Sequence, residues 1–162
     1  MIRALVSAAV VLCAAQVEAA SITGRGKAID STVVAIGDQR VMLFGVDSVM
    51  RKQACLLDGK PWQCWTAAVQ GLQSLLDQGT VTCETVGDAD VYGRYLGRCA
   101  VDGRSVNEEM VRRGFGVTRP SESSDYAGAE SEAKASKAGL WQGQFMQPSE
   151  FRRTAGILVE RP

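Results

Sequence analysis

The residues of this chain that could do chemistry are carboxylates, arginines, lysines, tyrosines and cysteines, because the 162-residue sequence contains no histidine. That absence excludes Ser-His-Asp and Cys-His catalysis, together with every histidine-ligated metal site. Any reaction would therefore depend on carboxylates, Arg, Lys or Tyr, or on a metal ion held by oxygen atoms. Asp88-Ala89-Asp90 could suggest calcium, but no EF-hand loop follows, so we interpret it as a turn.

Four cysteines remain once a leader segment at the N-terminus is set aside: Cys55, Cys64, Cys83 and Cys99. An even number in a small exported domain predicts two disulfides. Three pairings are possible, of which Cys55–Cys64 and Cys83–Cys99 are the local ones. A four-cysteine zinc site is disfavoured because no CxxC spacing occurs. Trp62 and Trp65 flank Cys64, and core packing around a disulfide is favoured there over an aromatic binding platform.

The leader segment is residues 1–19. Arg3 precedes an apolar run from Ala4 to Ala15, and small residues follow at a cleavage site, which is the pattern of a secretory signal peptide. We expect export to the periplasm or outside the cell, with no membrane span after cleavage. Cleavage would remove Arg3 and Glu18 and leave 17 basic and 17 acidic residues. This neutral balance lacks the basic footprint of strong nucleic-acid binding, without excluding a local patch.

The elements that must position these groups follow from apolar spacing and turn residues. We expect strands at residues 21–29, 32–36, 40–45, 81–85 and 91–101, with a hairpin turn at Gly37-Asp38. Helices are expected from Pro61 to Gly79, from a Ser105 cap to Gly114, and from Ser123 or Ser124 to Lys137. The residues after Trp141 show no clear period. Five short strands with an inserted helix indicate an α+β protein built on a small closed β-barrel.

Several sequence strings resemble the thermonuclease family, whose members are similar to staphylococcal nuclease. Residues 41–47 (VMLFGVD) resemble its V-R-L-x-G-I-D, residues 92–96 (YGRYL) its Y-G-R-x-L, and residues 106–111 (VNEEMV) its V-N-E-x-[LM]-V. Residues 126–132, Gly139-Leu140-Trp141 and the pair Pro148 and Arg152 resemble its C-terminal motifs. The resemblance covers about residues 22–153 and extends to an exported bacterial branch with two disulfides. It implies a five-stranded OB-fold barrel with three helices over residues 20–153, followed by a tail at 154–162.

The resemblance also implies a site for calcium-dependent hydrolysis of DNA and RNA. Asp47 matches a metal ligand of the family and Arg94 a phosphate-contacting arginine. The first metal ligand is Asp30 in one alignment and Ser31 in another. Met42 replaces the family's first arginine, in V-R-L, and Arg40, which shares its strand face, is displaced by about 6–7 Å.

Met50 stands where the family has the glutamate that activates water, and a thioether neither gives nor takes a proton. One or two aspartates would hold calcium weakly, so no cofactor is expected unless the nuclease site survives. The favoured function is a monomeric, catalytically impaired binding or accessory module, with an oligosaccharide or nucleic acid on the barrel face and a link to exopolysaccharide biosynthesis. The alternative is an active, calcium-dependent secreted endonuclease.

Overall fold

A computed structural model describes residues 20–156 of the chain, and the predicted signal peptide lies outside this range. The main sheet contains seven strands: β1 (Ser21–Gly24), β2 (Gly26–Asp30), β3 (Val33–Ile36), β4 (Gln39–Leu43), β8 (Val81–Val86), β9 (Arg94–Val101) and β10 (Arg104–Ser105). Its order is β1-β8-β9-β4-β3-β2, with β10 beside β9. The order begins and ends with β1 and β2, which only Arg25 separates in the chain.

The pairing gives the topology of an OB-fold. Neighbouring strands are antiparallel except β4 and β9, which are parallel and align Arg40 with Arg94 and Met42 with Leu96. The first strand of the barrel is bent, because its β1 half pairs with β8 and its β2 half with β3. The predicted α+β class and OB architecture are confirmed, and the predicted strands at 21–29 and 91–101 are shortened or split by bends and turns.

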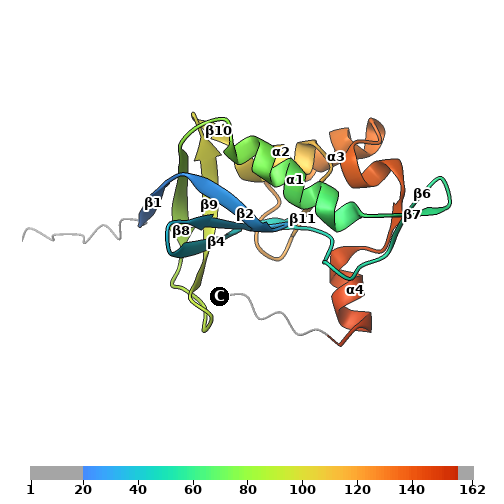
Figure 1. Cartoon of the computed structure of the whole chain (residues 1–162), viewed down its shortest axis with the longest axis horizontal. Coiled ribbons are helices and arrows are strands. Elements are labelled where there is room, and N and C mark those ends of the chain that lie inside the picture. The colour runs from blue at the N-terminus through green and yellow to red at the C-terminus, as the bar shows by residue number, and fades with distance from the viewer. Residues whose placement is uncertain (1–19, 157–162) are drawn as a thin grey trace, which may run out of the picture.

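The helices cover one end of this sheet (Figure 1). They are α1 (Cys64–Leu76), α2 (Val106–Arg112) and α3 (Ala127–Ala135), with a 3₁₀ turn, η1 (Gly139–Gln142), and a further helix, α4 (Pro148–Thr154). Leu72, Leu75 and Leu76 of α1 pack into the core, as their spacing predicts. Ser105 caps α2 by accepting a hydrogen bond from the Glu108 N–H at 3.2 Å. The sequence predicts three helices, and α4 is an addition to them.

The expectation that Pro61 begins a helix is wrong. Pro61 lies in β7 (Lys60–Trp62), which pairs with β6 (Cys55–Leu57), and α1 begins three residues later. The reason is the Asp58-Gly59 turn, in which both residues have positive φ and connect a two-residue hairpin. This hairpin also pairs with β12 (Gln144–Phe145), while β5 (Val46–Asp47) pairs with β11 (Val117–Thr118).

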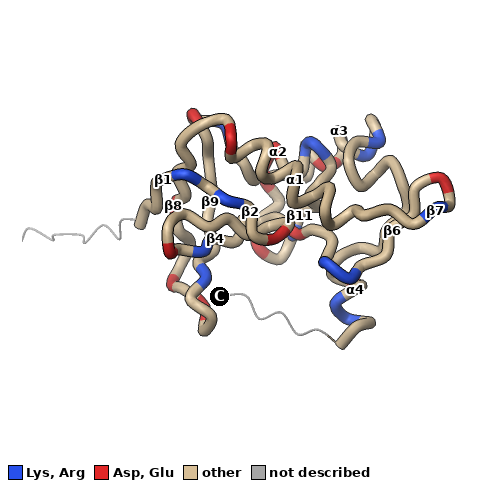
Figure 2. The backbone as a smooth tube through the Cα atoms, viewed as in Figure 1, with Lys and Arg blue, Asp and Glu red and all other residues tan. Residues whose placement is uncertain are grey.

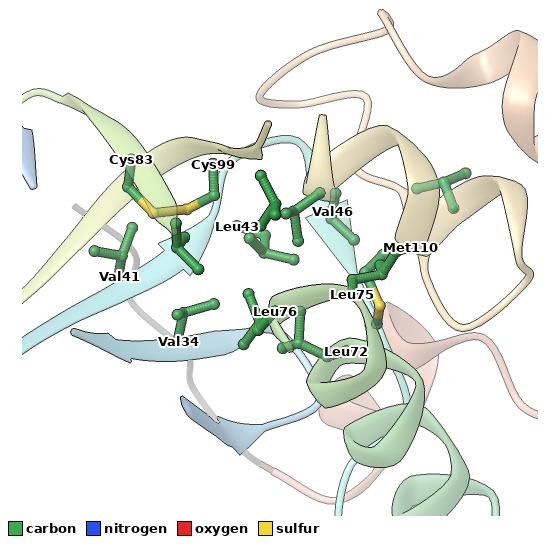
Figure 3. Packing of buried hydrophobic residues seen from close by; sticks show 14 of the residues in the cluster. Val34, Val41, Leu43, Val46, Leu72, Leu75, Leu76, Cys83, Cys99 and Met110 are labelled. Atoms are coloured by element: carbon green, nitrogen blue, oxygen red, sulfur yellow. A yellow bond between two sulfur atoms is a disulfide. The ribbon is translucent and has the colours of Figure 1, made fainter. Parts of the chain in front are cut away.

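Both disulfides take the local pairing. Cys83–Cys99 joins directly opposite residues of β8 and β9 within the main core (Figure 3), and Cys55–Cys64 ties the hairpin to the start of α1. Trp62 and Trp65 pack against the cluster around Cys55 and Cys64, which confirms the core-packing interpretation. Within residues 20–156, no helix is long and apolar enough to cross a membrane.

Candidate functional site

A pocket of about 130 Å³ opens where the barrel meets α4. It brings together residues that are far apart in the sequence, from the β2–β3 turn, β4, β5, the loop after β5, β9 and α4. The predicted site residues lie in this one pocket, whose lining is Asp30, Ser31, Thr32, Val33, Met42, Asp47, Ser48, Met50, Arg51, Arg94 and Arg152. The sequence motifs therefore converge in space, and what differs from expectation is how their charges are paired.

Asp47 lies at the end of β5 and is only 6% exposed. Its Oδ1 accepts a hydrogen bond from the Ser48 N–H at 2.9 Å and another from Arg152 Nη1 at 2.7 Å. Arg152 Nη2 donates to Oδ2, and Arg119 Nη1 lies 3.6 Å from the same oxygen. Both carboxylate oxygens are thus engaged by a two-pronged guanidinium, the strongest geometry for such a pair.

Arg152 comes from α4, a helix that the sequence does not predict by periodicity. Pro148 occupies the first turn of α4, where a missing N–H costs nothing, and Gln147 before it is extended. The preceding segment is held against the pocket loop because Gln53 Nε2 donates to the Met146 carbonyl at 2.5 Å. The Arg152 side chain is 12% exposed, so a positive charge 105 residues away in sequence is buried against Asp47.

Asp30 and Ser31 both line the pocket but have different environments. Asp30 is exposed, and its Oδ1 accepts hydrogen bonds from the Trp65 indole N–H and the Ser31 N–H, each at 2.7 Å. Ser31 is 4% exposed, and its hydroxyl donates to the Val49 carbonyl at 2.9 Å. Of Asp30 and Ser31, Asp30 therefore offers the pocket a carboxylate, whereas the Ser31 hydroxyl is used in a backbone hydrogen bond.

Arg94 is the first residue of β9, and Asp90 forms an ion pair with its side chain. Its Nε donates to Asp90 Oδ2 at 2.7 Å and its Nη2 lies 2.6 Å from the same oxygen. Asp90 Oδ1 accepts from the backbone N–H groups of Tyr92 and Arg94, at 2.9 and 2.8 Å. Burial raises the pKa of Asp90, but the bonds from Arg94 and the two backbone N–H groups lower it further, so its pKa lies below the ordinary value. Residues 88–90 are an irregular segment of the β8–β9 loop, and the turn that the sequence predicts there begins at Asp90, whose carbonyl accepts from the Gly93 N–H at 2.9 Å.

Met42 and Met50 both line the pocket, and Arg40 does not supply the charge that the family has at Met42. Met42 is 3% exposed and packs with Val33 and Leu96. Met50 lines the pocket from the loop after β5. Arg40 lies beside Arg94 in the sheet register, yet it is exposed and does not line the pocket. Arg40 therefore does not replace the positive charge that is missing at Met42.

The carboxylates of the pocket do not fit a calcium ion. Calcium takes six to eight oxygen ligands, several of them charged. Here both oxygens of Asp47 are bonded to Arg152, and Asp30 is the other carboxylate of the pocket. Within residues 20–156, no group of three or more Asp, Glu, His or Cys residues is placed to hold a metal ion. Of the two aspartates in the pocket, Asp47 is held in an internal ion pair, so the donor set does not match that of a calcium site.

Two contacts at the pocket were not predicted. Arg152 is part of a C-terminal motif, but its sequence position gives no sign that it reaches Asp47. Arg51 lines the pocket with its Cζ 4.4 Å from the centre of the Trp65 ring. A basic residue following Met50 in a polar loop was the only local signal for it.

Comparison with known proteins agrees with these sequence motifs. The model of a family described as "Staphylococcal nuclease homologue" matches residues 40–143. The chain is 34% identical over 127 residues to the succinoglycan biosynthesis protein ExoI of Rhizobium meliloti (strain 1021). The match covers 76% of this chain and 66% of that protein, so the chain spans about two thirds of the length of this relative.

Proposed function

The chain belongs to the staphylococcal nuclease homologue family, and from this premise we propose that it is a non-catalytic member, a binding or accessory module in exopolysaccharide biosynthesis. One observation carries the proposal. The guanidinium of Arg152 binds both oxygens of Asp47, the position that the family resemblance assigns to a metal ligand. Because the Arg152 guanidinium is bonded to both oxygens in a buried ion pair, a divalent ion would have to displace it to reach this carboxylate.

The chemistry of phosphodiester cleavage supports the same conclusion. The reaction needs an activated water and positive charge around the phosphate in the transition state. Losing an arginine that stabilises a transferring phosphate costs about 10³–10⁵ in rate, and losing a general base about 10²–10⁴. These effects are not additive, but the Met42 or the Met50 replacement alone is enough to leave only trace activity.

The link to polysaccharide rests on the relative and on the compartment. The relative is, by its name, a protein of succinoglycan biosynthesis. Disulfides such as Cys55–Cys64 and Cys83–Cys99 are typical of oxidising compartments outside the cytoplasm, where exported polysaccharide is found. An OB-fold commonly presents one barrel face to an oligonucleotide or oligosaccharide. Export by the segment 1–19 remains a prediction, and it would place this face with the polysaccharide.

A calcium-dependent endonuclease is the second candidate. The observation in its favour is that Asp30, Asp47 and Arg94 line one pocket, as the family resemblance implies. For activity, calcium would have to displace Arg152 from Asp47, and some other group would have to do the work of the missing glutamate.

A plasmid-cleavage assay separates the two functions. Purified, disulfide-bonded protein is incubated with supercoiled plasmid and calcium, with and without chelator. We expect no cleavage above background. Cleavage that the chelator stops, that Asp47→Asn abolishes and that Asp38→Asn leaves intact would contradict the proposal. Asp38 is a suitable matched control because it lies exposed in the β3–β4 turn, outside the pocket.

A further inference from the structure

We propose that Arg51, at the mouth of the same pocket, binds the carboxylate of an acidic saccharide, a step that rests on the proposed saccharide role. The proposal assigns a ligand class to a residue that the family resemblance does not use.

Arg51 differs from the other two arginines that line the pocket. Arg94 is paired with Asp90 and Arg152 with Asp47. Arg51 forms no ion pair with any residue that the structure describes, and it is exposed. It is therefore the pocket arginine whose guanidinium donors are available to a ligand, and a guanidinium binds a carboxylate through two parallel hydrogen bonds.

The position of Arg51 is fixed by Trp65, which lies outside the pocket lining. The Arg51 Cζ stacks 4.4 Å from the ring centre, a favourable cation–π distance. Trp65 in turn is held by its indole N–H, which donates to Asp30 Oδ1 at 2.7 Å, and by packing on the cluster around Cys55 and Cys64. A long side chain ordered in advance loses less entropy when it binds a ligand.

The charge balance of the pocket favours a ligand with one carboxylate and many hydroxyls. Three arginines and two aspartates line the pocket, and Asp90 neutralises Arg94 from outside the lining. Little net positive charge is left there for a polyanion such as nucleic acid, and along the described chain basic and acidic segments are interspersed (Figure 2). Asp30 lines the same pocket as Arg51, and its second carboxylate oxygen accepts no hydrogen bond from the described residues. A sugar hydroxyl can donate to that oxygen, whereas a phosphodiester offers only acceptors and would be repelled.

The pocket volume sets the size of the group that enters. Pockets that enclose whole small molecules measure roughly 300–1,000 Å³, and this one measures about 130 Å³. It accommodates a single acidic substituent, while the sugar rings would lie outside on the barrel surface. Exposed Tyr92, at the tip of the loop before Arg94, offers an aromatic face there.

The test is calorimetric titration of the disulfide-bonded protein with three trimers of similar length. The probes are trigalacturonate, which carries carboxylates, maltotriose, which is neutral, and a thymidine trinucleotide, which carries phosphodiesters. Each is titrated into the unaltered protein, Arg51→Gln and Lys52→Gln. Lys52 is the matched control because it is the exposed, basic neighbour of Arg51 and does not line the pocket.

We expect trigalacturonate to bind and maltotriose to bind more weakly or not at all. Arg51→Gln should weaken trigalacturonate binding about tenfold, because it removes a charge-assisted pair of hydrogen bonds. Lys52→Gln should change the affinity less than about twofold, because an exposed charge is screened by salt.

Absence of trigalacturonate binding, equal affinity in Arg51→Gln, or binding of the trinucleotide alone would overturn this inference. None of these results would restore catalysis, so the proposed non-catalytic role would stand. Plasmid cleavage in the separate assay would overturn that role whatever trigalacturonate does.

Discussion

The pocket and the outer face of α2 and α3 both contain arginine–carboxylate pairs, and the two regions bury them differently. In the pocket, the side chains of Arg152 and Asp47 are 12% and 8% exposed. On the helical face, Arg112 is 37% exposed and its partner Glu132 63%. The same chemical pair therefore sits in two different dielectric environments.

The helical face is a solvated surface, because its paired side chains are largely exposed. Arg112 contacts Glu108, Glu109 and Glu132, and the hydrogen bond that it donates to Glu132 outweighs the opposing effect of burial and raises the pKa of Arg112. Arg113 pairs with Glu109. Arg119, which follows α2 in the chain, instead contacts Glu122 and Asp47 and belongs to the pocket side.

The difference teaches that burial, and not the number of pairs, decides what an arginine does to function. A surface pair contributes about 0–1 kcal/mol and can be exchanged freely. When a buried pair loses one member, the other charge is left unpaired in the protein interior, which is strongly destabilising. Arg152 therefore keeps Asp47 in a buried ion pair. Arg112, in contrast, contributes little to stability and holds none of the described pocket residues in place.

The largest predicted effect is at Arg152. Arg152→Met should lower the free energy of unfolding by about 3 kcal/mol, because Asp47 is left buried without its main partner. Urea denaturation followed by circular dichroism measures the change. Arg153→Met is the matched control, since the Arg153 side chain is 75% exposed and its ion pair with Glu150 is long at 3.8 Å. A loss below about 1 kcal/mol at Arg152 would erase the contrast between the two regions.

An intermediate effect is expected from pH. Hydrogen bonds from Arg94, together with those from backbone N–H groups, outweigh burial and hold the pKa of Asp90 below its ordinary value; those from Lys134 and Thr118 do the same for Glu130. A carboxyl with a lowered folded-state pKa stabilises the protein above its ordinary pKa, and this stabilisation disappears as the pH falls through the folded-state value. Stability should therefore fall as the pH drops below about 4.5.

Asp90→Asn and Glu130→Gln test the origin of this dependence. Each variant should reduce the slope of unfolding free energy against pH in the acid range, measured by urea denaturation at successive pH values. Unchanged slopes in both variants would show that other carboxylates dominate the acid response.

The smallest effect is predicted for Arg112→Ala. We expect a loss of less than about 1 kcal/mol, which shrinks further in high salt because the pairs are exposed. Thermal unfolding at low and high ionic strength provides the comparison. A salt-independent loss as large as that of Arg152→Met would mean that burial is not what separates the two regions.

Much of the fold could be predicted from local sequence. The apolar spacing of Leu72, Leu75 and Leu76 predicts the core face of α1, and the short loops between cysteines favour the observed disulfides. The β6–β7 hairpin was missed because Pro61 is a helix-start signal as well as a tolerated residue of a short edge strand. The Asp58-Gly59 pair was the signal that could have decided between them.

The candidate site could be predicted only in part, for a physical reason. Asp47, Arg94, Met42 and Met50 belong to local motifs, so their convergence in one pocket follows from the family resemblance. The Arg152–Asp47 pair joins residues 105 positions apart, and no spacing rule connects them. The stacking of Arg51 on Trp65 depends likewise on how a loop and a helix meet in three dimensions.

Calcium titration by calorimetry, on the unaltered protein and on Asp47→Asn, tests most directly whether a protein guanidinium has taken the place of the metal. We predict that the unaltered protein shows no saturable binding tighter than about 1 mM, the weak end of extracellular calcium sites. Saturable, tighter binding that Asp47→Asn removes would show that calcium displaces Arg152, and would contradict the account.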